Sequence, residues 1–432
     1  MKMLASHAAQ GIGGRLLGPD VEFDGASFDT RSIEQGQLFV PIVAERNGHE
    51  FIGQAYDAGA ALHLTSQADE FRKDHTSIEV ADTARALMDL AAFARTQSSS
   101  RVVGVTGSVG KTSTKDLIGA ACSAQLRTTA NERSFNNEQG LPVTILNAPD
   151  DTEALILEMG MRGFGQITAL CEVARPEIGV VTTVGYSHTE LVGGIEGVAQ
   201  AKRELVEALP KSGTAVLNAD DDRVAAMARH TGASVLTFGT TGDVRISKLV
   251  LDELARPSFT IDTPWGSASV QLAVSGAHMA MNAAAAIAVA GSLGVDLDAA
   301  VAALDGAEVS GMRMEVTRLA SGAVIINDAY NANPTSMGAA LDAIVAMDAT
   351  RRFAVLGEMA ELDEPGEGHR EVARRAEALG VQLISTGTDL YGVRQAENPV
   401  AALGELGDGD VVLVKASRSA GLERIVTELI DG

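Results

Sequence analysis

A glycine-rich segment that ends in Lys-Thr is the place in this chain where residue types and spacing most directly suggest chemistry. It runs from Gly104 to Thr112, follows an apolar strand-like run and precedes a helix-like stretch from Thr114 to Ala121. Small residues allow backbone N–H groups to turn toward one anion, and a helix start adds partial positive charge. Lys111 can bridge the β and γ oxygens of a nucleotide, and Thr112 can offer a hydroxyl to Mg2+. The segment therefore predicts phosphoryl chemistry.

The spacing of this segment departs by one position from the usual phosphate-loop pattern. Counting back from Gly110, the first glycine should stand at Val105, but the available glycine is Gly104. A glycine-rich turn that binds nothing is the alternative interpretation. The order of strand, turn, Lys-Thr and helix favours a phosphate loop.

Two polar residues follow apolar runs in the same part of the chain. Glu158 comes directly after Ala154–Leu157, and His188 comes shortly after Ile178–Val184. Ligands of open α/β sheets bind beyond the carboxyl ends of strands, where a carboxylate can anchor Mg2+. A solvated loop glutamate is the alternative for Glu158. For His188, a ligand and a packing residue are equally compatible with the spacing.

Lys202 is predicted to lie on the apolar face of a helix from Ile195 to Leu209. Its neighbours three and four residues away include Val198 and Leu205. A lysine turned inward either extends its stem along the apolar surface or has a lowered pKa and a chemical task. The sequence leaves both interpretations open.

Two residues of the last third of the chain could complete a nucleotide site. Asp328 follows the run Val324–Ile326 and Asn327, so it can hold a ribose or a metal-bound water, although the Asn and Pro residues after it are also ordinary turn formers. Arg313 stands near an expected domain junction. A mobile domain that carries an arginine could complete a phosphate site on closing.

The composition limits the class of protein. The chain has 432 residues, of which 46% are hydrophobic, enough for several cores and about three domains of roughly 150 residues. A net charge of -23 argues against a nucleic-acid surface. The two cysteines, Cys122 and Cys171, lack metal-ligand spacing and are expected in the core. No signal peptide is seen, and Gly276–Val295 fits a packed helix better than a membrane span, so a cytoplasmic location is expected.

The elements that must position these residues alternate between apolar strands and helices, which predicts an α/β fold with parallel sheets. A polar segment at 96–100 and a new alternation near Gly311 mark two boundaries. We therefore expect three domains: a small α/β N-terminal domain (1–98), a central P-loop domain with a mainly parallel sheet (99–309), and a C-terminal Rossmann-like α/β domain (310–432).

Further segments extend the pattern over nearly the whole chain: Asp29-Thr30-Arg31, Gly48–Phe51, Thr106–Thr112, Phe135–Thr144, Glu158-Met159-Gly160, Ala201-Lys202, Asn218–Asp221, His278 with Asn282, Asp328–Pro334 and Leu356–Leu362. Together they resemble the Mur ligase family. The phosphate loop of that family has its first glycine where Gly104 lies, which accounts for the displaced spacing. Thr183 and Ser187 depart from the family pattern around His188.

The resemblance implies roles for individual residues. Lys111, Lys202, His188 and Arg313 would be catalytic. ATP would contact Gly107, Ser108, Val109, Gly110, Lys111, Thr112, Ser113, Asn282, Arg313, Asp328 and Asn331. The metal, Mg2+, would be held by Thr112, Glu158, His188 and a carbamylated Lys202, whose apolar setting suits CO2 capture because only a neutral amine reacts. The UDP substrate would contact Asp29, Thr30, Arg31, Asn136 and Asn137.

The resemblance also implies an activity: ATP-dependent amide formation through an acyl phosphate, joining D-alanyl-D-alanine to UDP-N-acetylmuramoyl-tripeptide in peptidoglycan synthesis. Tyr330–Pro334, Leu356–Met359, His369 and the absence of an Asp-Asn-Pro-Arg motif carry this choice within the family. A monomer without membrane or nucleic-acid partners is expected. The alternatives are a related ligase with another acceptor, such as a folate-type γ-glutamyl substrate, and a nucleotide-dependent switch protein. The sequence does not distinguish lysine from diaminopimelate in the tripeptide.

Overall fold

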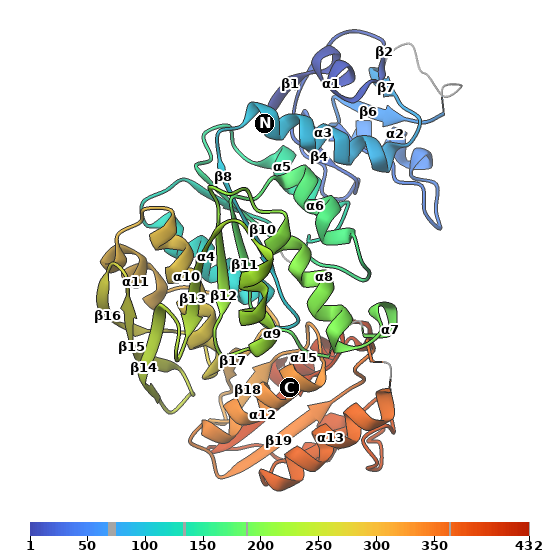
Figure 1. Cartoon of the computed structure of the whole chain (residues 1–432). Coiled ribbons are helices and arrows are strands. Elements are labelled where there is room, and N and C mark those ends of the chain that lie inside the picture. The colour runs from blue at the N-terminus through green and yellow to red at the C-terminus, as the bar shows by residue number, and fades with distance from the viewer. Residues whose placement is uncertain (68–74, 133–134, 187–188, 363, 432) are drawn as a thin grey trace.

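The chain folds into three α/β domains that follow one another along the sequence. The computed structural model describes residues 1–67, 75–132, 135–186, 189–362 and 364–431. In Figure 1 the N-terminal domain lies at the top, the central domain in the middle and the C-terminal domain at the bottom. The predicted fold class is thereby confirmed, whereas the domain limits given above stay a prediction.

The N-terminal domain is built on short strands. Its five-stranded sheet has the order β2-β7-β6-β5-β4, and β1 pairs with β3 in a separate ribbon. Leu38, Leu62, Leu64 and Ile78 are fully buried in its core. The elements are β1 (Lys2–Leu4), α1 (Ala5–Ile12), β2 (Arg15–Leu17), β3 (Glu22–Asp24), β4 (Ala26–Ser27), β5 (Leu38–Phe39), η1 (Gly48–Phe51), α2 (Ile52–Asp57), β6 (Leu62–Thr65), β7 (Ser77–Glu79) and α3 (Thr83–Gln97).

The central domain has a nine-stranded sheet of order β16-β15-β14-β13-β12-β11-β8-β10-β9. Pairing is parallel from β9 to β14 and antiparallel from β14 to β16. The elements are β8 (Arg101–Thr106), α4 (Lys111–Ser123), β9 (Thr128–Ala130), α5 (Gly140–Asn147), β10 (Ala154–Glu158), α6 (Gln166–Ala174), β11 (Ile178–Val181), α7 (Thr189–Val192), α8 (Ile195–Glu207), β12 (Thr214–Asn218), α9 (Asp222–Ala225), η3 (Ala226–His230), β13 (Ser234–Gly239), β14 (Val244–Leu251), β15 (Pro257–Thr263), β16 (Gly266–Gln271), α10 (His278–Ser292) and α11 (Leu297–Asp305).

The parallel strands of this sheet are buried because helices cover them. All five residues of β10 and all four of β11 are buried, which explains why their sequences read as continuous apolar runs. The mainly parallel sheet was predicted. The antiparallel strands β15 and β16 were not, because their alternating pattern has few large apolar residues.

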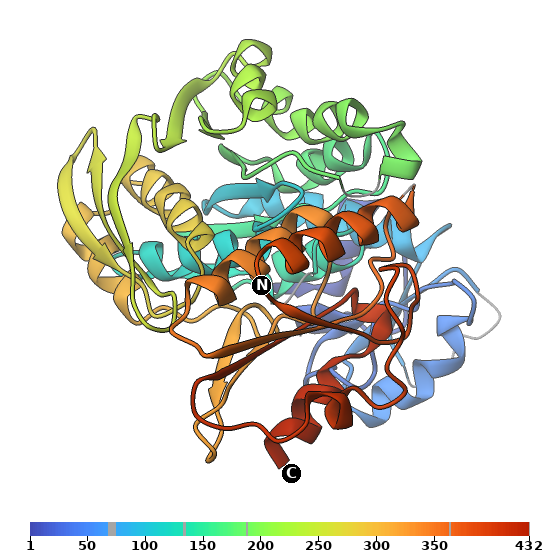
Figure 2. The same ribbon diagram turned by 90° about the horizontal axis from the view of Figure 1, so that it is seen from below.

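The C-terminal domain has a five-stranded sheet of order β17-β18-β21-β19-β20, in which only β17 runs antiparallel to its neighbour. Figure 2, the view from below, shows this domain lying across the central one. The elements are β17 (Glu315–Arg318), β18 (Val324–Asn327), α12 (Pro334–Ala346), β19 (Arg351–Leu356), α13 (Pro365–Ala378), β20 (Gln382–Ser385), α14 (Pro399–Leu403), β21 (Asp410–Lys415), η4 (Arg418–Ala420) and α15 (Glu423–Asp431).

Two expectations about buried segments are met. Cys122 and Cys171 are both buried, and burial raises the pKa of each thiol to about 12, so both are inert packing groups. Helix α10 buries most of its alanines against α4 and the sheet. Over the described ranges, no helix has the length and apolar character needed to span a bilayer.

A buried histidine makes the N-terminal domain sensitive to acid. His63 on β6 has Nδ1 2.9 Å from the Tyr56 hydroxyl, and burial, followed by the charges of His75 and His49, lowers its pKa to about 4. The unfolded chain, with a pKa of about 6.5, then binds more protons than the folded one between these values. Stability is therefore present above about pH 6.5 and is lost as the pH falls toward 4.

Lowering the pH from about 7 to about 4 is expected to remove about 3 kcal/mol of unfolding free energy from this domain through His63. Hydrogen exchange on β6, corrected for intrinsic rates, measures the change. His63→Gln should flatten the pH dependence, whereas the control His230→Gln, at an exposed site in the central domain, should leave it intact. An equally steep loss in His63→Gln would contradict the assignment.

Candidate active site

The phosphate loop between β8 and α4 depends on two glycines. Gly107 has φ 152° and Gly110 has φ 83°, values that L side chains rarely adopt. A Cβ on Gly107 would lie 1.8 Å from Oγ1 of Thr182, and one on Gly110 would lie 2.8 Å from Oδ1 of Asn282. The loop thus forms by close backbone approach to the end of β11 and to α10.

The loop leads directly into the start of α4. Ser108 N–H donates to Thr183 O at 2.8 Å and Val109 N–H donates to Thr183 Oγ1 at 3.2 Å, so these two groups are used inside the protein. The prediction that successive loop N–H groups face one anion is therefore wrong at these positions. The first N–H groups of a helix lack partners within it, so the start of α4 at Lys111 is the better anion site.

The side chains at the start of α4 are held in defined positions. Lys111 Nζ donates to Gly107 O at 2.9 Å, which folds the ammonium back over the loop. Burial lowers the pKa of Lys111, while the charges of Glu158 and Glu361 oppose the shift. Ser113 is buried in the first turn, and Ser108 exchanges hydrogen bonds with Gly185.

Glu158, at the carboxyl end of β10, is the centre of a polar cluster. Its side chain is 1% exposed. Thr112 donates to Oε2 at 2.6 Å and Asn136 donates to Oε1 at 2.7 Å. Asn131 Oδ1 accepts the Glu158 N–H at 2.8 Å. The strand-end prediction is thus correct in placing Glu158 beside the phosphate loop, and the alternative of a solvated loop residue is wrong.

Arg313 enters this cluster from the start of the C-terminal domain. Its guanidinium donates to Thr112 Oγ1 at 2.7 Å and lies 3.8 Å above the ring of Tyr330. Thr112 therefore accepts from Arg313 while it donates to Glu158. Arg313 of the C-terminal domain thus contacts Thr112 of the central domain. This contact agrees with the prediction that an arginine of a second domain reaches the phosphate loop.

Lys202 on α8 is 2% exposed, so its ammonium does not reach solvent. The alternative in which the stem of Lys202 extends along the apolar surface to bring the ammonium into water is therefore wrong. Burial, followed by the charge of Lys111, lowers its pKa well below the usual value, and Glu361 opposes the shift. Taking an ammonium out of water costs several kcal/mol, so this buried position favours the neutral form of the Lys202 amine. The charge of Lys111 acts on this amine, so Lys202 belongs to the surroundings of the phosphate loop.

A second group lies at the carboxyl ends of β18 and β21. Lys415 Nζ donates to Asp328 Oδ2 at 2.6 Å and to Asn331 O at 2.9 Å. Across the junction, burial lowers the pKa of His278 at the start of α10, and the charge of Asp328 opposes that shift. Asn282, on the same helix, is 8% exposed and lies against Gly110. The predicted ATP residues of the two domains therefore converge.

The predicted UDP-substrate residues lie in two places. Asp29, Thr30 and Arg31 lie in the N-terminal domain, where the Arg31 guanidinium donates to Oδ1 and Oδ2 of Asp29 and holds the pKa of that carboxyl below its usual value. Asn136 instead belongs to the Glu158 cluster. Asn137 accepts from Gln139 N and Gly140 N and so caps the start of α5.

His188 and Ser187 lie outside the described residues. Among those described, no three His, Cys, Asp or Glu side chains gather as they would around a structural metal. A Mg2+ ion bound with phosphates takes only one or two protein carboxylates, so the ion predicted from the sequence does not require such a cluster.

Three further residues near the site were not identified as candidates from the sequence. Lys415 follows the apolar run of β21 and could have been found by the same strand-end rule. Glu361 lies in a loop after β19 and acts electrostatically on both Lys111 and Lys202. Lys115 is 2% exposed and donates to Asn131 O, behind Glu158. Glu361 stands in the segment Leu356–Leu362 that carries the family resemblance, but its effect on Lys111 and Lys202 depends on how distant parts of the chain meet. Lys115 lies within α4, so the strand-end rule does not select it.

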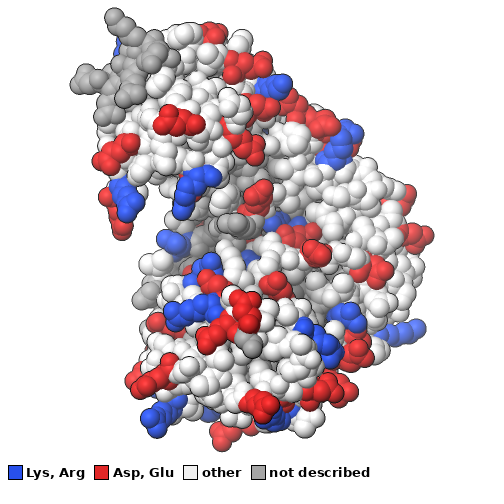
Figure 3. All heavy atoms as spheres, turned by 180° about the vertical axis from the view of Figure 1, so that it is seen from behind, with Lys and Arg blue, Asp and Glu red and all other residues white. Residues whose placement is uncertain are grey.

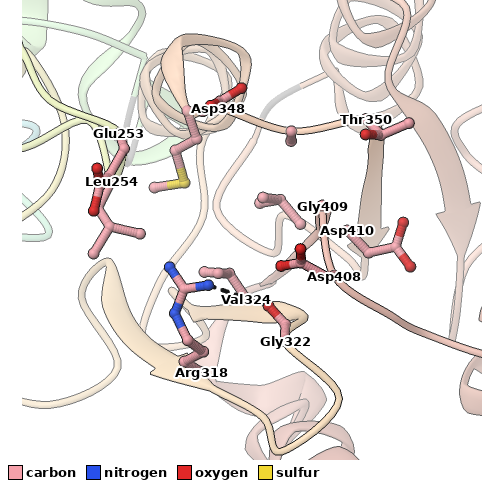
Figure 4. Close-up of a pocket in the computed structure, with 13 residues that line it drawn as sticks. Glu253, Leu254, Arg318, Gly322, Val324, Asp348, Thr350, Asp408, Gly409 and Asp410 are labelled. Atoms are coloured by element: carbon pink, nitrogen blue, oxygen red, sulfur yellow. Dashed lines mark hydrogen bonds between the residues drawn. The ribbon is translucent and has the colours of Figure 1, made fainter.

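Figure 3 shows a face hollowed between the N-terminal and C-terminal lobes, with acidic and basic side chains interspersed rather than a broad basic patch. A separate cavity of about 340 Å³ lies between the β14–β15 turn and the amino ends of β18, β19 and β21 (Figure 4). Its lining holds Glu253, Asp348, Asp408 and Asp410 against Arg318. This cavity lies at the amino ends of the strands, whereas ligands of open α/β sheets bind beyond the carboxyl ends. Its mainly acidic lining would also repel a triphosphate.

The fold and this junction define a three-domain phosphate-loop protein. Residues 105–290 match the Mur ligase middle domain, and residues 312–427 match the Mur ligase glutamate ligase domain. The UDP-N-acetylmuramoyl-tripeptide–D-alanyl-D-alanine ligase of Mycobacterium bovis is 40% identical over 466 residues, covering 93% of this chain and 91% of that protein. This chain belongs to the Mur ligase family.

Solved structures agree. MurF from Acinetobacter baumannii superimposes with a TM-score of 0.91 at 26% identity, covering 100% of this chain and 99% of that one. MurF ligase from Thermotoga maritima, solved in complex with ADP, has a TM-score of 0.83 at 27% identity, covering 94% and 96%. The family resemblance inferred from the sequence is confirmed.

Proposed function

We propose that this protein is the ATP-dependent ligase that joins D-alanyl-D-alanine to UDP-N-acetylmuramoyl-tripeptide, forming the UDP-linked pentapeptide of peptidoglycan synthesis. The observation that carries the proposal is the cluster at the domain junction, in which Arg313 of the C-terminal domain meets Thr112 and Glu158 of the central domain. The ADP-bound MurF neighbour supports ATP as the nucleotide.

The reaction needs activation because a carboxylate has no adequate leaving group. The terminal carboxylate oxygen of the tripeptide attacks the γ-phosphorus of ATP, the bond to the β-phosphate oxygen breaks, and ADP leaves. The neutral amine of D-alanyl-D-alanine then attacks the acyl carbon, inorganic phosphate leaves and a proton is lost. Lys111 and Arg313 would neutralise the charge of the transferred group, and closure of the C-terminal domain would exclude water.

Mg2+ fits the side chains present. Glu158 offers carboxylate oxygens and Thr112 a hydroxyl, which are the hard oxygen donors this ion prefers. When bound, Mg2+ would supply charge neutralisation at the phosphates. Lys202 would join this set as a carbamate, formed when its neutral amine takes up CO2 and releases a proton. His188 is proposed as a further ligand.

The remaining proposals complete the assignment. Asn282 would contact the adenine region, and Asp328 with Asn331 the ribose or the nearby phosphate side. Asp29, Thr30 and Arg31 would bind the UDP substrate. The protein would act in the cytoplasm as a monomer, with the domain limits 1–98, 99–309 and 310–432.

A coupled phosphate-release assay tests this function. Release that requires ATP, UDP-N-acetylmuramoyl-tripeptide and D-alanyl-D-alanine together is the expected result. Release with another amino-acid acceptor alone would support a related ligase. Nucleotide binding without any acceptor-dependent release would favour a switch protein and would overturn the proposal.

Lys202→Ala is expected to lower turnover by about 100-fold, because the substitution removes the anion that the carbamate would supply. Short-chain carboxylic acids, which return a carboxylate to the space vacated, should restore part of the rate. Steady-state rates with and without added acetate or propionate measure the effect. The control Lys211→Met, at an exposed lysine, should not respond to the acids. A Lys202→Ala enzyme that no acid rescues would count against the carbamate.

A further inference from the structure

The linker between the central and C-terminal domains is held at two points by one face of α4. The Ser310 N–H donates to Asp116 Oδ2 at 2.7 Å, and the Arg313 guanidinium donates to Thr112 Oγ1 at 2.7 Å. Thr112 and Asp116 stand four positions apart on α4, so their side chains lie on the same face one turn apart. The helix that begins at the phosphate loop therefore also holds the linker.

The Asp116 carboxylate is held in place by Lys115. Lys115 Nζ lies 2.8 Å from Asp116 Oδ1 and donates to Asn131 O at 2.6 Å. The Asn131 side chain in turn accepts the N–H of Glu158. A backbone N–H bound to a carboxylate makes a stronger bond than one to a neutral oxygen. The Ser310 anchor is thus strong and is tied to the strand end that carries Glu158.

The linker downstream of Ser310 is strained around Arg313. Met312 has φ 60° and Met314 has φ 52°, a region that residues with a Cβ seldom occupy. Such a conformation persists only where surrounding contacts impose it. Here the Met314 N–H donates to Asp328 Oδ1 at 3.2 Å, and Met312 O accepts from Tyr330 N–H at 3.3 Å. These two contacts lie within the C-terminal domain, and the bonds of Ser310 to Asp116 and of Arg313 to Thr112 add the central-domain side, so together they set the direction of Arg313.

We propose that Asp116 is a positioning residue for Arg313: by anchoring Ser310, it fixes the linker so that the strained turn presents the guanidinium to the phosphate loop. This inference rests on the role proposed for Arg313 in the ligase reaction. Because α4 starts at Lys111, the loop that receives the nucleotide and the linker that carries the C-terminal domain share one helix.

A double-mutant cycle tests the proposal in the full-length enzyme. Asp116→Ala alone is expected to lower kcat for substrate-dependent phosphate release by about 10- to 100-fold. In an Arg313→Ala background the same substitution should change kcat by less than about twofold, since the residue through which Asp116 acts is already gone. Asp116→Asn keeps an acceptor oxygen for Ser310 N–H but loses the charge that strengthens this bond and the ion pair with Lys115. It should therefore lower kcat by less than Asp116→Ala does, and again only where Arg313 is present. If the alanine variant fails to fold, this variant takes its place, and an equal loss with and without Arg313 would overturn the proposal.

Gln125→Ala is the matched control. Gln125 follows the end of α4 and exchanges hydrogen bonds with Asp296 at 2.7 and 3.0 Å, away from the linker. Its effect on kcat should be the same with and without Arg313. An equal loss from Asp116→Ala in both backgrounds would show a general structural role and overturn the proposal, as would an Arg313→Ala enzyme with unchanged kcat. Failure of the ligase function itself would be visible separately, as wild-type enzyme without acceptor-dependent release.

Discussion

Lys111→Met is expected to lower turnover by about 1000-fold, with a much smaller effect on folding. The ammonium folds back over the phosphate loop through Gly107 O at 2.9 Å, and it is partly buried near the charges of Glu158 and Glu361. Methionine has a similar length and suits a partly buried position, so the protein should fold without the lysine. The loss would therefore report the charge that this side chain places on the transferred phosphoryl group.

Initial rates of phosphate release at saturating ATP measure this loss, and the midpoint of thermal unfolding checks the fold. Lys211→Met, which removes an exposed lysine after α8, is the control and should keep wild-type rates. Turnover of Lys111→Met equal to that of the control would mean that the Lys111 ammonium takes no part in phosphoryl transfer.

Local sequence patterns predicted the elements that surround the site. Continuous apolar runs identified β10, β11 and β21. Parallel strands are buried on both faces, so their sequences are apolar throughout instead of alternating between apolar and polar residues. The rule that ligands gather at the carboxyl ends of such strands then selected Glu158 and Asp328. The inward direction of Lys202 followed from helical spacing alone.

The remaining contacts depend on how the domains dock, which no local pattern encodes. Arg313 and Thr112 are 201 residues apart, and Ser310 and Asp116 are 194 residues apart. The side chains involved gain their neighbours only when the C-terminal sheet lies against the central one. Asn137 shows a different limit of prediction from sequence. Its side chain accepts a backbone N–H at the start of α5, and many turn residues do the same, so the sequence does not separate this structural role from substrate binding. Family resemblance supplied candidates here, but the structure decides which of them meet.

Glu158→Gln is expected to lower turnover by about 100- to 1000-fold and to raise the Mg2+ concentration needed for half-maximal rate. Both carboxylate oxygens already accept hydrogen bonds, from Thr112 at 2.6 Å and Asn136 at 2.7 Å. An amide has one acceptor oxygen, so its NH2 group must face one of these donors, and the negative charge that attracts the ion disappears. The change is therefore electrostatic and local.

Activity measured across a Mg2+ titration separates this role from a packing defect. Glu153→Gln is the matched control, because Glu153 stands just before the amino end of the same strand and pairs with Arg127 at the surface. It should leave both the rate and the Mg2+ requirement unchanged. If Glu158→Gln loses rate while its Mg2+ requirement stays that of wild type, the carboxylate orders Thr112 and Asn136 rather than binding the ion. Metal binding would then have to be sought among other groups at this end of the central sheet.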